Sequence, residues 1–445
     1  MSSILAFRSL AHIALMLALL VTALPAQAVT LLRDPDIEHG LNKVAAPVLR
    51  AAGLGSNIKV LVVKDSRLNA FVVDSQHIFI HSGMLLKLTS AAQFQAVVAH
   101  EAAHIANGHI TRRQTNMGTA RTAAGLGMAL AVAAAAAGAD GNAVAGLALG
   151  TTSSAHRRFL AHTRAEEASA DQSGIRYLVN AGVDPKAAVE LHEIFRGQES
   201  LSAARRDPYT RTHPRTHDRI RALKGFVATY GGASKPSPET EYWFARSKGK
   251  LSAFIRSPKW TLLRAKESPS ADIRAMREAA AYHRQSNRAG ALKTINSAIA
   301  MRPKDPFYHE LKGQILLESR QFGAAVQAYK QAVALAPKNA LILGGHGRAL
   351  LAAGHPTAAQ AALEKARARD FRDGRVLRDL AAAYARNGRN GMASAVTAER
   401  YALQGRLKDA GLHAKRAMGL LPRGSAAWRR SQDILIAAEA AEKRR

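Results

Sequence analysis

The stretch FQAVVAHEAAHIANGH, residues 94–109, decides what kind of fold this chain adopts. His100 and His104 lie four residues apart in it, and Glu101 directly follows the first histidine. Four residues advance an α-helix by about 400°, so the two histidines share one face and can bind a single metal ion. Glu101 lies beside them, where a carboxylate can take a proton from an attacking water. The spacing predicts a metal-binding helix, with an ordinary exposed helix as the alternative.

A catalytic zinc ion takes three protein ligands and keeps one position open, so a further ligand must come from elsewhere in the chain. His109 lies five residues past the second histidine, roughly 140° around a continuous helix, and is not expected to share the ion. The segment TRAEEASADQSGI, residues 163–175, offers Glu166 or Glu167 instead. Asp171 lies four residues after Glu167 on one helix face and could hold the outer nitrogen of a histidine ligand. This spacing favours Glu167.

The first 28 residues show the pattern of a signal peptide. Arg8 precedes an apolar run at residues 13–24, and the tripeptide AQA at 26–28 forms a small-residue cleavage site. We expect removal of residues 1–28 and a mature chain that begins near Val29; an uncleaved N-terminal anchor is the alternative. The sequence contains no cysteine, which excludes disulfides and thiolate zinc fingers. Any metal must therefore be bound through nitrogen and oxygen.

The chain is strongly basic, with a formal net charge of +30. Residues 281–445 hold 29 Lys and Arg against 12 Asp and Glu, a balance of +17. Such a charge favours anionic partners: nucleic acid, phosphorylated lipid or membrane headgroups. Because an exported protein rarely meets nucleic acid, we expect peripheral contact with an anionic membrane surface or an envelope complex, and no nucleic acid. A basic surface without a dedicated partner is the alternative.

Residues 29–265 are expected to form one domain that is mostly helical with a small β-sheet. Hydrophobic patterning predicts strands at residues 58–63, 69–73 and 77–83. Helical periodicity predicts helices at residues 29–54, 83–113, 156–180, 184–196, 218–230 and 244–255. Residues 231–241 are rich in turn-forming residues and indicate a linker.

Residues 117–155 consist almost entirely of small and apolar residues. They predict a helical hairpin that acts as a lid over the site or touches a membrane. A transmembrane span is the alternative, but spans need about 20 apolar residues and depend mainly on larger side chains than alanine and glycine.

The chain repeats itself after residue 266. Pro303 and Pro337 are 34 residues apart, as are Gly313 and Gly347, which is the period of a tetratricopeptide helix pair. Three units follow this template from residue 272, and a last unit around Tyr401 is shifted in phase. Residues 266–445 therefore predict an all-α solenoid with a concave binding face, against the alternative of a generic helical bundle.

Together these motifs resemble the gluzincin zinc metallopeptidases, the family that includes the heat-shock membrane protease and the CAAX prenyl protease. The resemblance rests on HEAAH and on the pattern R-x-x-E-x-x-x-D-x-x-G formed by Arg164, Glu167, Asp171 and Gly174. It also rests on three shorter stretches: LNAF at 68–71, IFIHSGML at 78–85 and THPRTHDRI at 212–220. The fold it implies is an α+β gluzincin metallopeptidase domain followed by an all-α tetratricopeptide solenoid.

The resemblance also implies roles for particular residues. One Zn²⁺ per chain would be held by His100, His104 and Glu167, with Glu101 as the base and Asp171 behind a ligand.

For three further residues the resemblance implies alternative roles. His213 would stabilise the developing oxyanion or fill the open zinc position at rest, with a structural histidine as the alternative. Arg219 would orient its loop or a substrate carboxylate. The strand near Asn69 offers an edge to which an extended substrate could add.

For function, we expect a zinc-dependent endopeptidase of the periplasm that degrades misfolded or stalled outer-membrane proteins and supports their assembly. Its partners would be unfolded or misassembled envelope proteins and, through the repeat array, the machinery that assembles outer-membrane β-barrels. One alternative is a chaperone or scaffold that acts mainly by binding. Another is an integral-membrane prenyl-type protease, which would need true spanning helices.

Overall fold

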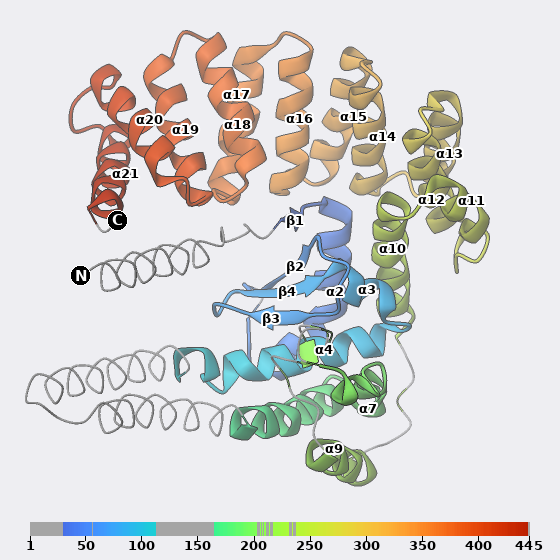
Figure 1. Ribbon diagram of the computed structural model, residues 1–445. Coiled ribbons are helices and arrows are strands. Elements are labelled where there is room, and N and C mark those ends of the chain that lie inside the picture. Colours follow the sequence, from blue (N-terminus) through green and yellow to red (C-terminus); the bar gives the residue numbers. More distant parts are fainter. Residues whose placement is uncertain are drawn as a thin grey trace, which may run out of the picture. The chain divides into compact units, whose positions relative to one another are not determined.

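The fold is mostly helical, with one small sheet followed by helical repeats, as the sequence predicts (Figure 1). The computed structural model describes residues 30–55, 57–112, 164–202, 205, 207, 209–210, 213, 217–230, 234 and 237–443. The predicted signal peptide at 1–28 and the predicted hairpin at 117–155 lie outside these residues. Within them, no helix combines the length and the apolar character needed to cross a bilayer.

The sheet has four strands: β1 (Leu31–Leu32), β2 (Lys59–Val63), β3 (Ala70–Val72) and β4 (His77–His81). Their order is β1-β2-β4-β3, so β3 lies at an edge. β2 and β4 are parallel, with Val60 opposite Ile78 and Val62 opposite Ile80. These four side chains are at most 1% exposed. In β4 they alternate with the partly exposed His77 and Phe79, but in β2 the intervening Leu61 and Val63 are buried as well, so β2 is covered on both faces.

The helix predicted from residue 29 is wrong at its start. Residues 31–32 pair with β2 instead, and α2 (Pro35–Ala51) begins only after them. The side chain of Asp34 accepts hydrogen bonds from the backbone amides of Asp36 and Ile37, and Pro35 occupies the first turn. A capping carboxylate and a proline in the first turn are strong helix-start signals. The buried face of α2 packs on the sheet and on α4.

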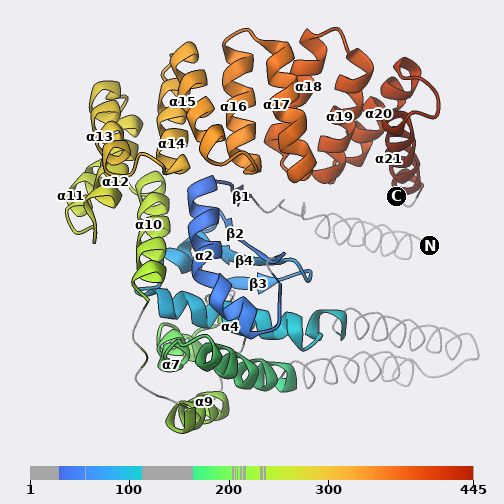
Figure 2. The same cartoon turned by 180° about the vertical axis from the view of Figure 1, so that it is seen from behind.

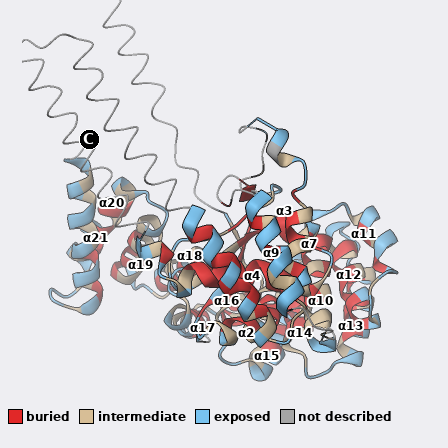
Figure 3. Ribbon diagram, turned by 90° about the horizontal axis from the view of Figure 1, so that it is seen from below, coloured by how far each residue is buried: buried red, intermediate tan, exposed pale blue. Residues whose placement is uncertain are grey.

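The single helix predicted at residues 83–113 is also wrong. It is divided into α3 (Ser82–Lys87) and α4 (Ala91–Ala106), because Leu88 is extended and Ser90 caps α4 by accepting a hydrogen bond from the Gln93 amide. α4 ends at Ala106, and Gly108 follows with a φ of +69°, which glycine adopts without strain. α4 is buried over most of its length (Figure 3).

Further helices complete this part of the chain. Residues 164–180 are helical, and they are followed by α7 (Lys186–Glu193) and α9 (His217–Tyr230). α10 (Pro238–Ile255) begins inside the predicted linker, because Pro238 and two glutamates suit the first turn of a helix. α10 lies along α2 (Figure 2), and α11 (Pro258–Ala265) follows it.

The remaining helices form the repeat array. They are α12 (Ala271–Arg284), α13 (Arg288–Met301), α14 (Pro306–Glu318), α15 (Phe322–Leu335), α16 (Ala340–Ala352), α17 (Pro356–Arg369), α18 (Gly374–Arg386), α19 (Asn390–Leu403), α20 (Leu407–Leu420) and α21 (Ala426–Glu442). A Cβ at Gly313 would lie 2.7 Å from the Tyr329 ring, and one at Gly347 would lie 2.5 Å from Leu363. The 34-residue glycine period therefore reflects close packing of paired helices. α18 belongs to none of the repeat units predicted from the sequence, because it lies between the third unit and the last unit around Tyr401.

Candidate metal centre

The two histidines of the opening motif point from one face of α4 into the interior. His100 is 6% exposed and His104 is 1% exposed. Between and beside them lie Ala99, Ala102 and Ala103, which are all buried. These small side chains let the helix at residues 164–180 approach α4 closely, because a Cβ on Gly174 would lie 3.5 Å from the Ala99 backbone. The close approach brings Glu167 to the histidines.

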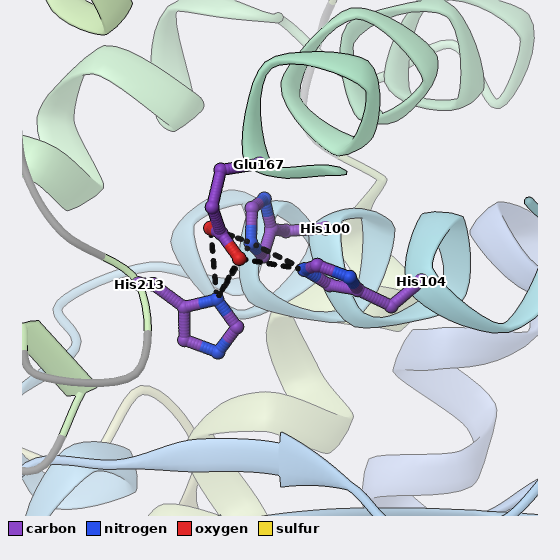
Figure 4. A group of neighbouring side chains, drawn as sticks. All are labelled: His100, His104, Glu167 and His213. Carbon is purple, nitrogen blue, oxygen red and sulfur yellow. Dashed lines mark hydrogen bonds and ion pairs between the residues drawn. The ribbon is translucent and has the colours of Figure 1, made fainter. Parts of the chain in front are cut away.

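Four buried side chains converge on one point: His100, His104, Glu167 and His213 (Figure 4). The Nε2 atoms of His100 and His104 are 3.2 Å apart, and each lies 3.3 Å from a Glu167 carboxylate oxygen. Nδ1 of His213 lies 3.1 Å from His100 Nε2 and 2.9 Å from a Glu167 oxygen. All four ligand atoms lie within 4.8 Å of one another.

These distances fit a metal ion. A tetrahedral zinc ion bound at about 2.0–2.1 Å holds neighbouring donor atoms about 3.3 Å apart. The distances given above are 2.9–3.3 Å. The donors are three imidazoles and one carboxylate, a set that suits zinc and other borderline divalent metals. Within the described residues, this group could hold a metal ion, and three of its four members belong to the predicted ligand set.

The charge of the pocket also favours a cation. Burial opposes a charge on His100, but hydrogen bonds to Asp171 and Glu167 outweigh it and raise the pKa of His100 to about 10. Burial lowers the pKa of His104 to about 3, and the neighbouring His100 adds to this effect. Burial alone would raise the pKa of Glu167, yet His213 and the other histidines hold it well below its ordinary value. The buried carboxylates thus draw positive charge to the centre.

Glu101 lies next to the converging side chains. It is fully buried, and its Oε1 atom is 3.4 Å from Nε2 of His213. Glu101 is not a member of the four-residue ligand group. Glu101 therefore lies beside the four converging side chains and contacts His213.

Asp171 and Arg219 support the centre from behind. Asp171 Oδ1 lies 3.2 Å from His100 Nδ1, the ring nitrogen that faces away from the cluster. Arg219 of α9 donates two hydrogen bonds to Asp171, at 2.7 and 2.8 Å, and its guanidinium also lies 3.2 Å from Glu167. Although burial opposes it, this arginine and His100 hold the pKa of Asp171 well below its ordinary value. Arg219 thus orients a carboxylate of the protein itself.

Hydrogen bonds connect the segment that carries His213 to the residues just before β3. Its backbone amide donates to Tyr209, whose own amide donates to the Leu68 carbonyl at 3.1 Å, two residues before β3. The Leu68 amide donates in turn to Asp207 at 3.1 Å. The Tyr209 ring packs on His213 at 4.8 Å between centroids. These contacts therefore fix the position of the segment that carries His213 relative to β3.

Asn69 lies at the start of the edge strand. It is 8% exposed, and its backbone carbonyl accepts a hydrogen bond from His81 in β4. Within the described residues, no donor reaches its side-chain oxygen. A buried amide oxygen of this kind is available to a hydrogen-bond donor on a ligand.

His109 makes a contact that its spacing from His104 does not predict. Its Nδ1 atom lies 3.0 Å from Nδ1 of His104, on the side opposite the cluster. The helical angle used to set His109 aside does not apply, because α4 ends at Ala106 and Gly108 turns the chain. The glycine before His109 was the available signal.

Two family models match parts of this chain. Residues 32–227 match the model of peptidase family M48, and residues 316–384 match a model of the tetratricopeptide repeat. The chain is similar to the beta-barrel assembly-enhancing protease of Escherichia coli (strain K12), with 24% identity over 388 residues that cover 85% of this chain and 78% of that protein.

A Vibrio cholerae relative with the same descriptive name is 24% identical over 224 residues, which cover 49% of this chain and 44% of that protein. The match therefore spans less than half of that relative's length. Among solved structures, the chain is similar to one titled "MamA MSR-1 C2", with a TM-score of 0.31 and 18% identity over 37% of this chain and 97% of the other.

Proposed function

We propose that this chain, which carries a metallopeptidase domain of family M48 followed by tetratricopeptide repeats, is a zinc-dependent endopeptidase of the cell envelope. One observation carries the proposal: three histidine nitrogens and a carboxylate from three separate segments converge at distances that fit a tetrahedral ion. His100, His104 and Glu167 would hold the zinc. When bound, zinc supplies a Lewis acid that activates water and polarises a peptide carbonyl.

The side chains of this chain would perform the proton transfers. Glu101 would take the proton of the attacking water and pass it to the departing amine, because it is the buried carboxylate beside the ligands. Asp171 would hold the His100 ring in the orientation that directs Nε2 to the centre. Arg219 would fix Asp171 in turn through its two hydrogen bonds.

We assign to His213 the fourth corner of the resting centre. Its Nδ1 atom lies 3.1 Å from His100 Nε2 and 2.9 Å from a Glu167 oxygen, separations that two ligands of one ion can have. Its Nε2 atom faces Glu101. In this position it excludes a substrate carbonyl from the centre. It would have to move aside before catalysis, and it could then donate to the developing oxyanion.

Substrate would bind as an extended strand along β3, the edge of the sheet nearest to α4. The side-chain oxygen of Asn69 would accept a hydrogen bond from that strand. Unfolded chains offer such segments and folded proteins hide them, so we propose that the substrates are misfolded or stalled outer-membrane proteins. The names of the curated relatives support a role in β-barrel assembly.

We further propose that the chain consists of a signal peptide at 1–28, a peptidase domain at 29–265, in which residues 117–155 would form an Ala/Gly-rich hairpin or lid, and a repeat domain at 266–445. The mature protein would reside in the periplasm, with peripheral membrane contact. The repeats would bind unfolded envelope proteins or the assembly machinery of outer-membrane β-barrels, since such arrays present extended binding surfaces.

Substitution of the base tests the proposal. Glu101→Gln is expected to lower the cleavage rate of an unfolded β-barrel protein by about 10²–10⁴-fold, because it removes the proton acceptor. The variant should still bind one equivalent of zinc, measured by elemental analysis, because Glu101 is not a ligand. Alanine at His100, His104 or Glu167 should instead release the metal.

The second candidate function, a chaperone or scaffold, is favoured by the repeat array and makes a different prediction. If the protein acts by binding alone, Glu101→Gln will support outer-membrane protein assembly as well as the wild type does. Zinc retained in Glu167→Ala would contradict the ligand assignment. Cleavage that persists in Glu101→Gln would contradict the proposed mechanism.

A further inference from the structure

A basic trough lies between α2 and three turns of the repeat array, those after α13, α15 and α17. Two cavities form it, of about 650 Å³ and 860 Å³, and both are lined by His39, Lys338 and Asn339. The first extends along α2 to its carboxyl end, and the second extends over the turns at residues 302–307 and 335–339. Shared lining residues make the two cavities one elongated recess. We call this recess the basic trough.

The trough has a large excess of positive charge. Its exposed lining cations are Lys43, Arg50, Lys59, Arg302, Lys304, Lys338 and Arg369. Of these, Arg302 pairs with Asp272 at 2.5 Å. The acidic residues in its lining are already engaged. Arg33 pairs with Glu38 at 2.6 Å and with Asp370 at 2.7 Å, and buried Arg246 pairs with Asp305 at 2.5 Å.

The walls of the trough are partly apolar. Leu49, Leu54 and Ile58 contribute to the first cavity, and Leu335 and Pro337 to the second. At the junction the His39 ring contacts the rings of Trp243 and Phe307, with centroids 4.9 and 4.8 Å away. A recess with cations at its rim and apolar side chains in its walls is complementary to a ligand that carries both anionic and apolar groups.

We propose that the trough binds an extended acidic segment of a partner polypeptide, in which carboxylates alternate with apolar side chains. Carboxylates would meet the exposed lysines and arginines, and apolar side chains would meet the leucine, isoleucine and proline surfaces. Because the two cavities adjoin at His39, Lys338 and Asn339, an extended chain could pass from one to the other. A bilayer presents its headgroups on a flat surface, which fits a convex patch better than a recess lined by α2 and the array.

The trough is separate from the metal centre. None of its lining residues belongs to the four-residue cluster. Glu101, Asp171 and Arg219, which surround that cluster, do not line the trough either. Binding there would add an attachment point that requires neither zinc nor proteolysis. Peptide binding at the trough can therefore be tested separately from zinc binding and proteolysis.

The test measures binding of a fluorescent peptide of alternating glutamate and leucine to the full mature chain by anisotropy. A lysine–leucine peptide of equal length is the specificity control. The trough variant combines Lys43→Glu, Lys59→Glu and Lys338→Glu, all at exposed positions. The matched control combines Lys408→Glu, Lys415→Glu and Arg416→Glu, at exposed positions of α20 that carry the same charge change.

We expect wild type and the α20 variant to bind the acidic peptide within twofold of one another, and the trough variant to bind it at least tenfold more weakly. Binding should also weaken with added salt. Lys43→Gln, Lys59→Gln and Lys338→Gln together should give an intermediate affinity, which guards against misfolding caused by charge reversal. Binding of the same proteins to vesicles of anionic lipid is measured in parallel. Three results would overturn the proposal: unchanged peptide affinity in the trough variant, equal losses of peptide affinity in both charge-reversed variants, or a trough variant that loses binding to the vesicles but not to the peptide.

Discussion

His100 and His104 occupy equivalent places in the cluster, yet different groups hold their outer nitrogens. Asp171 lies 3.2 Å from Nδ1 of His100, and Arg219 fixes that carboxylate. His109 lies 3.0 Å from Nδ1 of His104. A metal-binding imidazole needs a proton on its outer nitrogen and an acceptor for that proton. His109 can supply that acceptor for His104 as Asp171 does for His100.

The His109 contact leads to a prediction about metal affinity. His109→Ala removes the acceptor and should weaken zinc binding about 10–100-fold, the usual effect of losing a group that orients a ligand. His109→Asn should restore part of the affinity, because an amide oxygen can accept the same hydrogen bond. Competition with a chromophoric chelator at fixed pH measures both.

Asp171→Asn is the comparison for His109→Ala and should fall in the same range. If His109→Ala binds zinc as tightly as wild type while Asp171→Asn does not, the contact between the two histidines is incidental. Equal affinity of the alanine and asparagine variants, both far below wild type, would point to packing rather than to a hydrogen bond.

Asp272 joins the helices α10, α12 and α14. It is 4% exposed and accepts hydrogen bonds from Tyr242 at 2.7 Å and Tyr308 at 2.9 Å, with Arg302 beside it at 2.5 Å. Burial alone would raise its pKa. Neighbouring hydroxyls, those of Tyr242 and Tyr308 among them, and the guanidinium of Arg302 outweigh burial and lower the pKa of Asp272 from 3.8 to about 2.

A lowered carboxyl pKa fixes the sign of a pH effect. The folded state favours the ionised form of Asp272, so its contribution is fully present above pH 3.8 and is lost as the pH falls toward 2. That contribution is about 2 kcal/mol. Asp272→Asn should therefore lower the free energy of unfolding at pH 7 by about that amount, and its deficit relative to wild type should shrink below pH 4.

Urea unfolding of both proteins between pH 7 and pH 2.5 measures this deficit. Asp433→Asn, at an exposed position of α21, is the control and should stay within about 0.5 kcal/mol of wild type. A deficit that stays constant across the whole range would show that Asp272 contributes through packing and not through its charge.

Elements whose signals are local could be predicted from the sequence. The spacing of His100 and His104 depends only on helix geometry, and the glycine period depends only on the packing of adjacent helices. The break between α3 and α4 was missed because Leu88 and Thr89 are neither glycine nor proline, although Ser90 is a strong helix-start residue. β1 was missed because two residues show no periodicity.

Placements that depend on distant parts of the chain could not be predicted in the same way. The position of His213 depends on hydrogen bonds that Leu68 makes with Tyr209 and Asp207, more than 130 residues away. Glu166 and Glu167 are both buried, and only the packing of residues 164–180 on α4 directs Glu167 to the histidines. Local sequence patterns therefore identify candidate site residues, and contacts between distant parts of the chain determine which of them lie at the centre.

At the scale of the whole described chain, α10 joins the sheet-bearing part to the repeats through buried charges. Arg246 is fully buried and pairs with Asp36 of α2 at 2.8 Å and with Asp305, just before α14, at 2.5 Å. Lys250 is also fully buried and lies 3.0 Å from Asp34 and 3.7 Å from Glu310. Burial alone would lower the pKa of Lys250, but these carboxylates raise it well above its ordinary value.

Such a network should make the two parts of the chain unfold together. Arg246→Ala leaves Asp36 and Asp305 without their shared cation, and removing one partner of a buried ion pair costs about 3–5 kcal/mol. We expect calorimetry of the wild type to show one unfolding transition. Arg246→Ala should show two, because Asp36 of the sheet-bearing part and Asp305 of the repeats then lose the buried cation that they share.

Arg274→Ala is the control for this prediction, because it removes an arginine side chain that is 53% exposed on α12. It should leave a single transition and change the free energy of unfolding by no more than about 0.5 kcal/mol. Two transitions in the wild type would show that the network does not couple the parts. A single transition in Arg246→Ala, at the wild-type temperature, would show that apolar contacts of α10 with α2 and α12 are sufficient without the buried charges.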